Sequence, residues 1–375
     1  MNGVRIGRLF GIEIRIHASW FVILALFAFT LATREGWREW GPVTAWVAAV
    51  IATLLFFATV LAHELGHSLV AQRQGIEVKS ITLFILGGVA SIEKEADSPA
   101  HEALMAGVGP LVSLAIGAVA IGLWAVLPGP EQVAAVLVYI GVANLVLAIF
   151  NLLPGFPLDG GRILRALLWW RNHDFTRATR QATRVGQIFG AVLIAIGAIE
   201  AVAGDPLGGI WLAFVGWILI QAARASAEQA VLQHELTGVP TERIMSRPTE
   251  WISPFITLDR AAEGHFENFD TRCLPVQPET LDQQYDGLIC GADLIKAPRG
   301  EWDRGRVRDV MVPAAQLRTV TPETPADEAL ALLRQEGVDR LGVVDAEGYL
   351  VGIVDETSIA RFALAQETRA AEAAG

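Results

Sequence analysis

The chain has 375 residues, of which 53% are hydrophobic and only 18% charged, a composition too apolar for an ordinary soluble protein of this length. Its formal net charge of -11 is unevenly distributed: residues 1–226 carry 15 Lys and Arg against 14 Asp and Glu, whereas residues 227–375 carry 14 against 26. This acidity excludes nucleic acid as a partner. The numbers predict a domain embedded in the lipid bilayer, joined to an acidic soluble part.

The first 18 residues alternate arginines with isoleucine and valine, which predicts a β-hairpin at the membrane surface rather than a cleaved signal peptide. Six apolar segments follow as candidate membrane spans. A spanning helix needs about 20 residues, so some of these segments are marginal in length. The candidates are residues 18–33, 41–62, 103–127, 132–153, 185–203 and 206–223.

The second segment carries no charge from Gly41 to Ala62 and continues into His-Glu-Leu-Gly-His at residues 63–67. Positions i and i+4 share one helix face, so His63 and His67 can bind one metal ion. A glutamate between two such histidines is the general base of H-E-x-x-H zinc peptidases. Because ionisable groups at membrane depth usually mark function, we expect a zinc site with Glu64 as general base.

Residues 81–90 are apolar, too short to span a bilayer, and contain the pair Gly87-Gly88. A re-entrant or hairpin segment fits this pattern, because irregular backbone at membrane depth is tolerated only against protein or a water-filled cavity. An ordinary core strand is the alternative.

A catalytic zinc ion usually has three protein ligands, and Asp159 is the best candidate for the third. It follows the long fourth segment within Asn-Leu-Leu-Pro-Gly-Phe-Pro-Leu-Asp-Gly-Gly at residues 151–161, where prolines break the helix and glycines permit tight turns. Alternatively, Asp159 only caps the next helix. The other histidines are expected to be structural: His17, His101, His173, His234 and His265.

The distribution of Lys and Arg in short loops predicts orientation. The N-terminal segment has three arginines, and the stretch after the fourth candidate span has six, whereas residues 128–131 have none. We therefore expect the N-terminus, the active-site end of the second span and the C-terminal domain in the cytoplasm.

The H-E-x-x-H motif in one membrane helix and Asn-x-x-Pro-x-x-Pro-x-Asp-Gly after a later one resemble the site-2 protease family of intramembrane zinc metalloproteases. The resemblance covers most of residues 1–226. It implies one Zn²⁺ per chain bound by His63, His67 and Asp159, with Glu64 as general base. It also implies that Asn151 hydrogen bonds the scissile carbonyl or its oxyanion. The implied substrate is a transmembrane or membrane-associated protein, cut in regulated intramembrane proteolysis.

The acidic part contains a repeat after a linker at residues 227–242. Arg-Ile-Met-Ser-Arg-Pro at 243–248 recurs in form as Arg-Asp-Val-Met-Val-Pro at 308–313. Each is followed by a helical stretch (258–269 and 326–336) and by two apolar runs. Residues 243–375 thus resemble a tandem pair of cystathionine-β-synthase-type (CBS) domains, with a degenerate first repeat at 243–297 and a clear second one at 306–365.

Pairs of CBS domains often bind adenosine nucleotides through a hydroxyl residue and an aspartate after the last strand. By this resemblance Asp293 is the candidate nucleotide-binding residue, although Cys290 replaces the hydroxyl residue. In the second repeat Asp355 and Ser358 depart from the pattern at both positions. A packing or homodimerisation module is the alternative, and either form would regulate the membrane domain.

The expected fold is therefore a polytopic α-helical membrane protein with β-segments, followed by a soluble α/β domain. The expected function is an intramembrane zinc endopeptidase of the cell membrane. The alternatives are a transporter or channel gated by the CBS pair and an inactive scaffold. Cys273 and Cys290 are expected to be reduced thiols, with pairing as the alternative. Gly186 and Gly190 form a GxxxG pair that packs helices within one chain or between chains.

Overall fold

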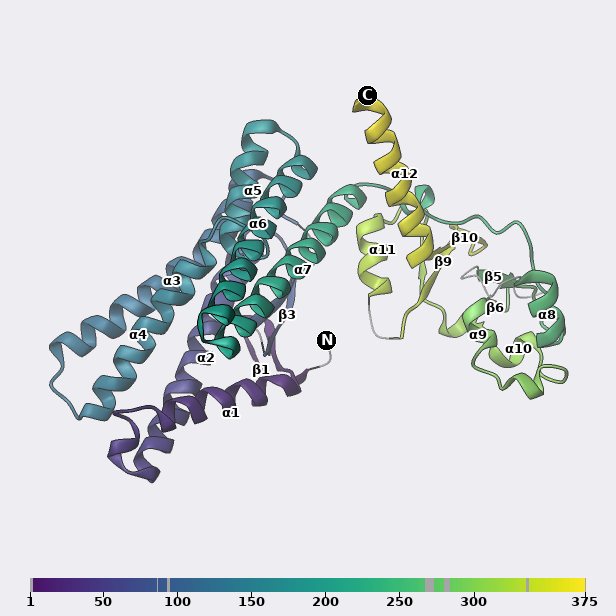
Figure 1. Ribbon diagram of the computed structural model, residues 1–375. Coiled ribbons are helices and arrows are strands. Elements are labelled where there is room, and N and C mark those ends of the chain that lie inside the picture. Colours follow the sequence, from purple (N-terminus) through teal and green to yellow (C-terminus); the bar gives the residue numbers. More distant parts are fainter. Residues whose placement is uncertain are drawn as a thin grey trace. The chain divides into compact units, whose positions relative to one another are not determined.

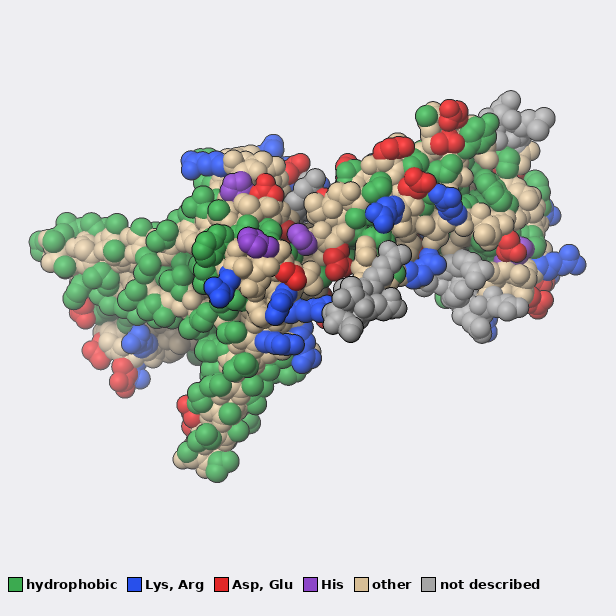
Figure 2. All heavy atoms as spheres, turned by 90° about the horizontal axis from the view of Figure 1, so that it is seen from above, with side chains coloured by type: hydrophobic (Ala, Val, Ile, Leu, Met, Phe, Trp, Pro, Cys, Tyr) green, Lys and Arg blue, Asp and Glu red, His purple; other side chains and the backbone are tan. Residues whose placement is uncertain are grey.

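The computed structural model describes residues 3–85, 87–92, 95–266, 273–279, 284–334 and 337–374 (Figure 1). It divides into two compact units, Met1–His234 and Glu235–Gly375. In Figure 2 hydrophobic side chains cover most of the surface of the first unit's helices, whereas charged side chains are scattered over the second unit.

Five helices within the described ranges are long and apolar enough to cross a membrane, so the protein is a multi-pass membrane protein. The first predicted segment also forms an apolar helix, α1 (Ala18–Thr33), but its 16 residues fall short of the usual span length. Three of the five begin with proline at the first or second position, where its missing N–H costs nothing. The five are α2 (Pro42–Arg73), α3 (Pro99–Val126), α4 (Glu131–Asn151), α6 (Phe175–Ala203) and α7 (Pro206–Leu236).

A four-stranded sheet in the first unit joins two segments that are far apart in the sequence. Its strands are β1 (Val4–Leu9), β2 (Ile12–Ile16), β3 (Val78–Phe84) and β4 (Gly87–Ile92), in the order β1-β2-β3-β4. Both predicted β-segments are confirmed as antiparallel hairpins, and β2 pairs with β3 in parallel. Apolar side chains of β2 and β3 form a core cluster with residues of α2 and α3, so the sheet is anchored to the helices that carry the site.

Gly186 and Gly190 pack segments of the same chain. A Cβ atom at Gly190 would lie 2.7 Å from the carbonyl oxygen of Gly216, so α6 and α7 approach closely there. A Cβ atom at Gly186 would lie 2.1 Å from the carbonyl oxygen of Phe156. The GxxxG pair therefore serves packing within the chain, between α6, α7 and the loop before α5 (Asp159–Asn172).

The second unit contains two three-stranded sheets, with strand orders β5-β6-β7 and β10-β9-β8. Each repeat contributes a helix and then two antiparallel strands, as the sequence predicts; residues 267–269 and 335–336 of the two predicted helices lie outside the described residues. The strands are β5 (Cys273–Val276), β6 (Gly287–Cys290), β7 (Val312–Pro313), β8 (Thr319–Val320), β9 (Arg340–Val344) and β10 (Leu350–Asp355). The helices are α8 (Leu258–His265), α9 (Gly291–Leu294), α10 (Val307–Val310), α11 (Ala326–Leu333) and α12 (Glu356–Ala374).

The two repeats exchange their first segments. Strand β7 belongs to the second repeat but pairs with β6 of the first. Conversely, Ser246 of the first repeat forms a bridge with Ile353 in β10 of the second. The two repeats therefore form one folded unit rather than two independent domains.

The expectation of two reduced cysteines is wrong in this structure, because a disulfide joins Cys273 and Cys290. The two residues are direct partners in the β5–β6 ladder, with their Cα atoms 4.0 Å apart. Side chains directly opposite one another on adjacent strands lie within bonding reach. Their separation of 17 residues in the sequence does not reveal this register.

Candidate metal centre

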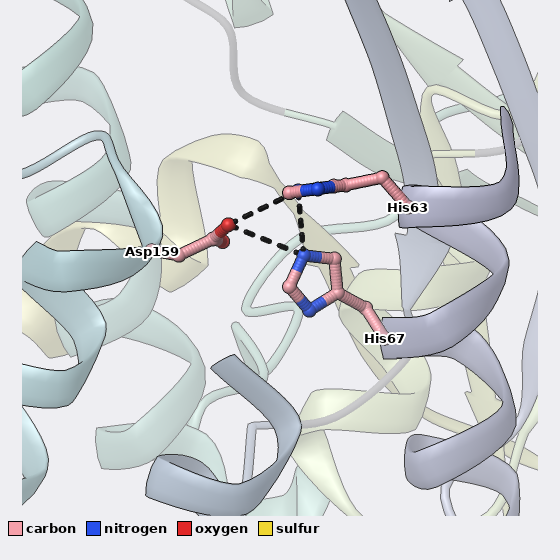
Figure 3. Close-up of side chains that lie close together, drawn as sticks. All are labelled: His63, His67 and Asp159. Atoms are coloured by element: carbon pink, nitrogen blue, oxygen red, sulfur yellow. Dashed lines mark hydrogen bonds and ion pairs between the residues drawn. The ribbon is translucent and has the colours of Figure 1, made fainter. Parts of the chain in front are cut away.

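Helix α2 places His63 and His67 on one face, and their Nε2 atoms lie 3.1 Å apart. Asp159, the first residue of α5, points at the same spot, with Oδ2 3.2 Å from Nε2 of His63 and 3.3 Å from Nε2 of His67. Figure 3 shows the three side chains converging from the two helices. The three residues predicted from the sequence as metal ligands thus lie close together. Asp159 begins helix α5, and its carboxylate also lies in the cluster.

This geometry fits a zinc ion. Zinc binds imidazole nitrogen and carboxylate oxygen at about 2.0–2.2 Å, so two ligands of a tetrahedral site lie about 3.3 Å apart. The three distances here are 3.1, 3.2 and 3.3 Å. These residues form a cluster able to hold a metal ion, with two buried members and one half-buried member.

Helix α3 orients both histidines and leaves room beside them. Nδ1 of His67 lies 2.6 Å from the carbonyl oxygen of Met105, and Nδ1 of His63 lies 2.9 Å from Oγ of Ser113. A proton on each Nδ1 leaves both Nε2 atoms as metal ligands. Between the two partners, Gly109 faces the cluster: a Cβ atom there would lie 2.1 Å from Nε2 of His67.

The sequence reasoning did not identify these three positions on α3. Met105, Gly109 and Ser113 recur every four residues, so they lie on one helix face. A glycine and a serine four residues apart inside an uncharged span are the sequence features that could have indicated a face of α3 next to the site. Met105 contributes only its backbone carbonyl, which carries no signal in the residue type.

Glu64 lies against strand β4. A Cβ atom at Gly88 would be only 2.5 Å from Cγ of Glu64, so the bare backbone of Gly88 makes room for the glutamate. At the neighbouring Gly87 the backbone has φ of +130°, a conformation that favours glycine. The two glycines therefore have different local roles. Gly87 allows the positive φ at the start of β4, and Gly88 leaves space for Glu64.

The loop before α5 is built on close backbone contacts. A Cβ atom at Gly160 would lie 2.3 Å from the carbonyl oxygen of Leu152, and one at Gly161 would lie 2.3 Å from the carbonyl carbon of Gly155. Gly155 in turn packs on Gly186 of α6. Only glycine fits these approaches, which explains why Asp159 is embedded in a glycine-rich segment.

Asn151 is the last residue of α4, and its Nδ2 donates a hydrogen bond to the Leu147 carbonyl one turn earlier. One of the two amide N–H groups of Asn151 is therefore engaged by its own helix in this structure. The other histidines within the described ranges lie outside the cluster. For example, His101 pairs with Asp97 at 2.6 Å, and His234 stacks on Phe175 with ring centroids 4.1 Å apart.

Asp293, the nucleotide-binding candidate, has a complete set of partners within the second unit. Both of its carboxylate oxygens accept hydrogen bonds from Arg340, and Nζ of Lys296 and the backbone N–H of Cys290 add bonds of 2.8 Å each. Burial raises the pKa of Asp293, but these donors outweigh burial and hold the pKa below its ordinary value. The carboxylate is thus already neutralised by the fold.

A multi-pass membrane protein with a His-His-Asp cluster able to hold a metal ion, next to a glutamate, has the features of a membrane metallopeptidase. Two family models match: "Peptidase family M50" over residues 51–134 and 130–196, and "CBS domain" over residues 307–365. The chain is 37% identical to "Putative zinc metalloprotease sll0528" of Synechocystis over 96% of this chain and 94% of that protein. It is 33% identical to "Putative zinc metalloprotease Rip3" of Mycobacterium tuberculosis over 96% and 92%.

The chain belongs to peptidase family M50. It is a zinc metallopeptidase with a CBS domain in its second unit, and these findings favour the protease over a transporter or channel. Among solved structures it is similar to the site-2 protease from Methanocaldococcus jannaschii, at 27% identity over 60% of this chain and 95% of that chain, with a TM-score of 0.46. It is also similar to CBSX2 in complex with AMP, at 27% identity over 35% and 99%, with a TM-score of 0.29.

Proposed function

We propose that the protein is an intramembrane endopeptidase that cuts a transmembrane or membrane-associated protein in regulated intramembrane proteolysis. His63, His67 and Asp159 are the zinc ligands, and Glu64 is the general base. The single observation that carries this assignment is the convergence of three ligand atoms beside a glutamate on a helix of membrane length. A site inside a spanning helix is accessible to substrates that lie in the bilayer.

Zinc, when bound, supplies Lewis acidity that polarises the scissile carbonyl and makes water more acidic. Glu64 follows His63 on α2 and accepts the proton of the attacking water, then passes it to the leaving amine. Gly88 keeps β4 close to Glu64 without a side chain between them, so peptide lying along β4 reaches the glutamate. Asn151 hydrogen bonds the scissile carbonyl through the amide N–H that does not bond the Leu147 carbonyl.

A helical substrate must be extended before it is cut, because a helix engages its own carbonyl groups. Strand β4 stands at one end of the described sheet, in the order β1-β2-β3-β4. An edge strand offers unpaired backbone groups to an incoming strand. Pairing of the extended substrate with β4 places its backbone beside Glu64.

The proposed organisation follows the sequence. Residues 1–226 form the protease domain, 227–242 the linker, and 243–375 the CBS pair with repeats at 243–297 and 306–365. The N-terminus, the active-site end of α2 and the CBS pair lie in the cytoplasm. The support is the positive-inside rule, because arginines concentrate in α5 and at the start of α6.

The CBS pair regulates the protease by binding an adenosine nucleotide or by forming a homodimer. Asp293 binds a ribose only if it releases Arg340, because its carboxylate is engaged. A cavity of about 400 Å³ in the second unit is lined by two arginines, Arg243 and Arg361, and by Ser246 and Ser358, groups suited to phosphate. The test is isothermal titration of the full chain with AMP and with ATP. Loss of binding in Arg361→Met would place the nucleotide in the cavity, and loss in Asp293→Asn would place it at Asp293. Absence of heat leaves dimerisation as the regulatory mode.

The proposal is tested with purified wild-type protein and a panel of membrane-tethered reporter substrates. Glu64→Gln is expected to retain one zinc per chain and to lose cleavage, because it removes the base and keeps the ligands. Glu77→Gln, an exposed acid that follows the same helix, is the matched control and should cleave normally. Cleavage by Glu64→Gln at the wild-type rate would remove Glu64 from the mechanism, and wild-type protein without zinc would overturn the ligand assignment.

A further inference from the structure

Arg165 is a charged residue with only 1% of its surface exposed, and it lies on α5 six residues after Asp159. Its Nε donates a hydrogen bond of 2.5 Å to Oε1 of Glu102, and its Nη2 donates one of 2.8 Å to Oε2 of Glu95. Glu102 is fully buried. Burying charges is costly unless they are paired in good geometry, so this arrangement needs a reason beyond stability.

Two aromatic rings flank the same guanidinium group. Its carbon lies 5.1 Å from the ring centroid of Phe156 and 4.5 Å from that of Phe175, within the range of cation–π attraction. Phe156 belongs to the loop that leads into Asp159, and Phe175 begins α6. Arg165 therefore contacts the loop before α5, the start of α6, Glu102 of α3 and Glu95 at once.

Glu102 connects this cluster to the helix that orients the histidines. It lies in the first turn of α3, where the helix dipole favours a carboxylate. Met105, one turn later on α3, holds His67 through its carbonyl oxygen, and Ser113 holds His63. The pair Arg165–Glu102 thus ties the helix of the third ligand to the helix that fixes the first two.

The Asp159 carboxylate lacks such support of its own. Within the described ranges, the histidines His63 and His67 are the hydrogen-bond partners found for it. Its position is therefore set by the backbone of the loop and by the attachment of α5. Glu95 reinforces the attachment: burial raises its pKa, but Arg165 and Arg162 outweigh burial and hold the pKa below the ordinary value.

We propose that Arg165 and Glu102 form a positioning pair that holds Asp159 at ligating distance from the two histidines. The proposal rests on the assignment of Asp159 as a zinc ligand. Neither residue touches the ligand atoms; they act through the placement of α5 against α3. Groups that hydrogen bond a metal ligand typically change metal affinity by 10–100-fold when removed. Displacement of Asp159 itself is measurable in the same way, as weaker zinc binding.

The test measures zinc affinity of the full-length protein by competition with a chelator, together with melting of the zinc-free form. Glu102→Gln keeps the shape and removes one charge, whereas Arg165→Met keeps an apolar stem between Phe156 and Phe175. Both are expected to weaken zinc binding at least tenfold, and the double variant less than the two effects multiplied. Arg171→Met, an exposed arginine on the same helix, is the control and should bind zinc normally.

The visible absorption of the cobalt-substituted protein gives a second readout. Loss of tetrahedral geometry weakens this absorption, so Glu102→Gln is expected to show weaker bands than the wild type. The proposal would be overturned if folded Glu102→Gln and Arg165→Met kept wild-type zinc affinity and wild-type cobalt bands and showed only a lower melting temperature. The pair would then be merely structural. If Arg165→Met does not fold, Glu102→Gln and Arg165→Lys decide by the same criteria.

Asp159→Asn distinguishes a failure of the zinc-ligand assignment from a failure of the positioning role. If Asp159→Asn retains wild-type zinc affinity, the ligand assignment of the proposed function fails and the positioning role falls with it. If Asp159→Asn loses zinc while Arg165 and Glu102 variants bind it normally, only the positioning role fails.

Discussion

Asp159 in the first unit and Asp293 in the second both lie near the start of a helix, and both are candidates for ligand binding from the sequence. Asp293 is surrounded by Arg340, Lys296 and a backbone N–H, which neutralise it. Asp159 faces two imidazole nitrogens beside a glycine. Its partners are residues able to bind a metal ion, so the cluster has the composition of a cation site.

This contrast shows that a carboxylate at a motif position is informative only together with its neighbours. The Asp293 environment is complete without a ligand, because every strong donor around it belongs to the chain. The Asp159 environment gathers ligand atoms at the mutual distances of a zinc tetrahedron. A buried charge therefore indicates a binding site where the fold leaves it without a countercharge of its own.

The largest expected effect is that of Gly109→Ala. The added methyl group would lie 2.1 Å from Nε2 of His67 and 2.7 Å from Nε2 of His63, the two atoms proposed as zinc ligands. We expect zinc affinity to fall by more than about 100-fold, with cleavage lost, since removal of mere orienting groups already costs 10–100-fold. Metal analysis after dialysis checks this.

Gly107→Ala is the matched control for this substitution, because nothing lies within 4 Å of a Cβ atom at Gly107 on the same helix. It should retain zinc and gain slightly in stability, since alanine is the better helix former. Equal zinc content in both alanine variants would show that the space at Gly109 is not part of the metal site.

Arg340→Met tests whether Asp293 in the second unit depends on Arg340 as its countercharge. It leaves the fully buried Asp293 with Lys296 and one N–H, and breaking a buried pair from one side costs about 3–5 kcal/mol. We expect faster hydrogen exchange in β6 and β9 of the full-length protein, with unchanged zinc content. Arg304→Met removes an exposed arginine and should alter neither; lost zinc in Arg340→Met would contradict the separation of the two clusters.

The smallest expected effect is on pH dependence. The pKa of Asp293 is lowered in the folded state, so its contribution to stability is full above the unfolded value of about 3.9 and is lost as pH falls through the folded value. The stability difference between wild type and Asp293→Asn should therefore stay constant from pH 7 to about pH 4 and shrink as the pH falls below the unfolded value.

Melting of both proteins in the same detergent, followed by hydrogen exchange in β6, measures this difference. A difference that stays constant across the range would show that Asp293 is not ionised by its partners in the fold. Glu279→Gln, a half-exposed acid of the same unit, controls for the general loss of carboxylate charge.

Much of the site is readable in the sequence because its signals are local. The spacing of His63 and His67 on one helix follows from helical periodicity, and the uncharged run before them indicates a spanning segment. The N-terminal hairpin and the strands around Gly87 follow from alternation and from glycine positions. These features depend on neighbouring residues only, so no tertiary information is needed to predict them.

The sequence alone predicts the chemical groups of the site: two histidines and a glutamate at the end of an uncharged run, a later aspartate in a glycine-rich segment, and an acidic repeat. The groups that surround them are visible only in the folded chain. Ser113, the Met105 carbonyl and the Arg165–Glu102 pair lie far from the motif along the chain, and the Cys273–Cys290 bond and the Asp293–Arg340 pair depend on strand register. The physical reason is that these contacts join distant segments, whose packing no local pattern specifies.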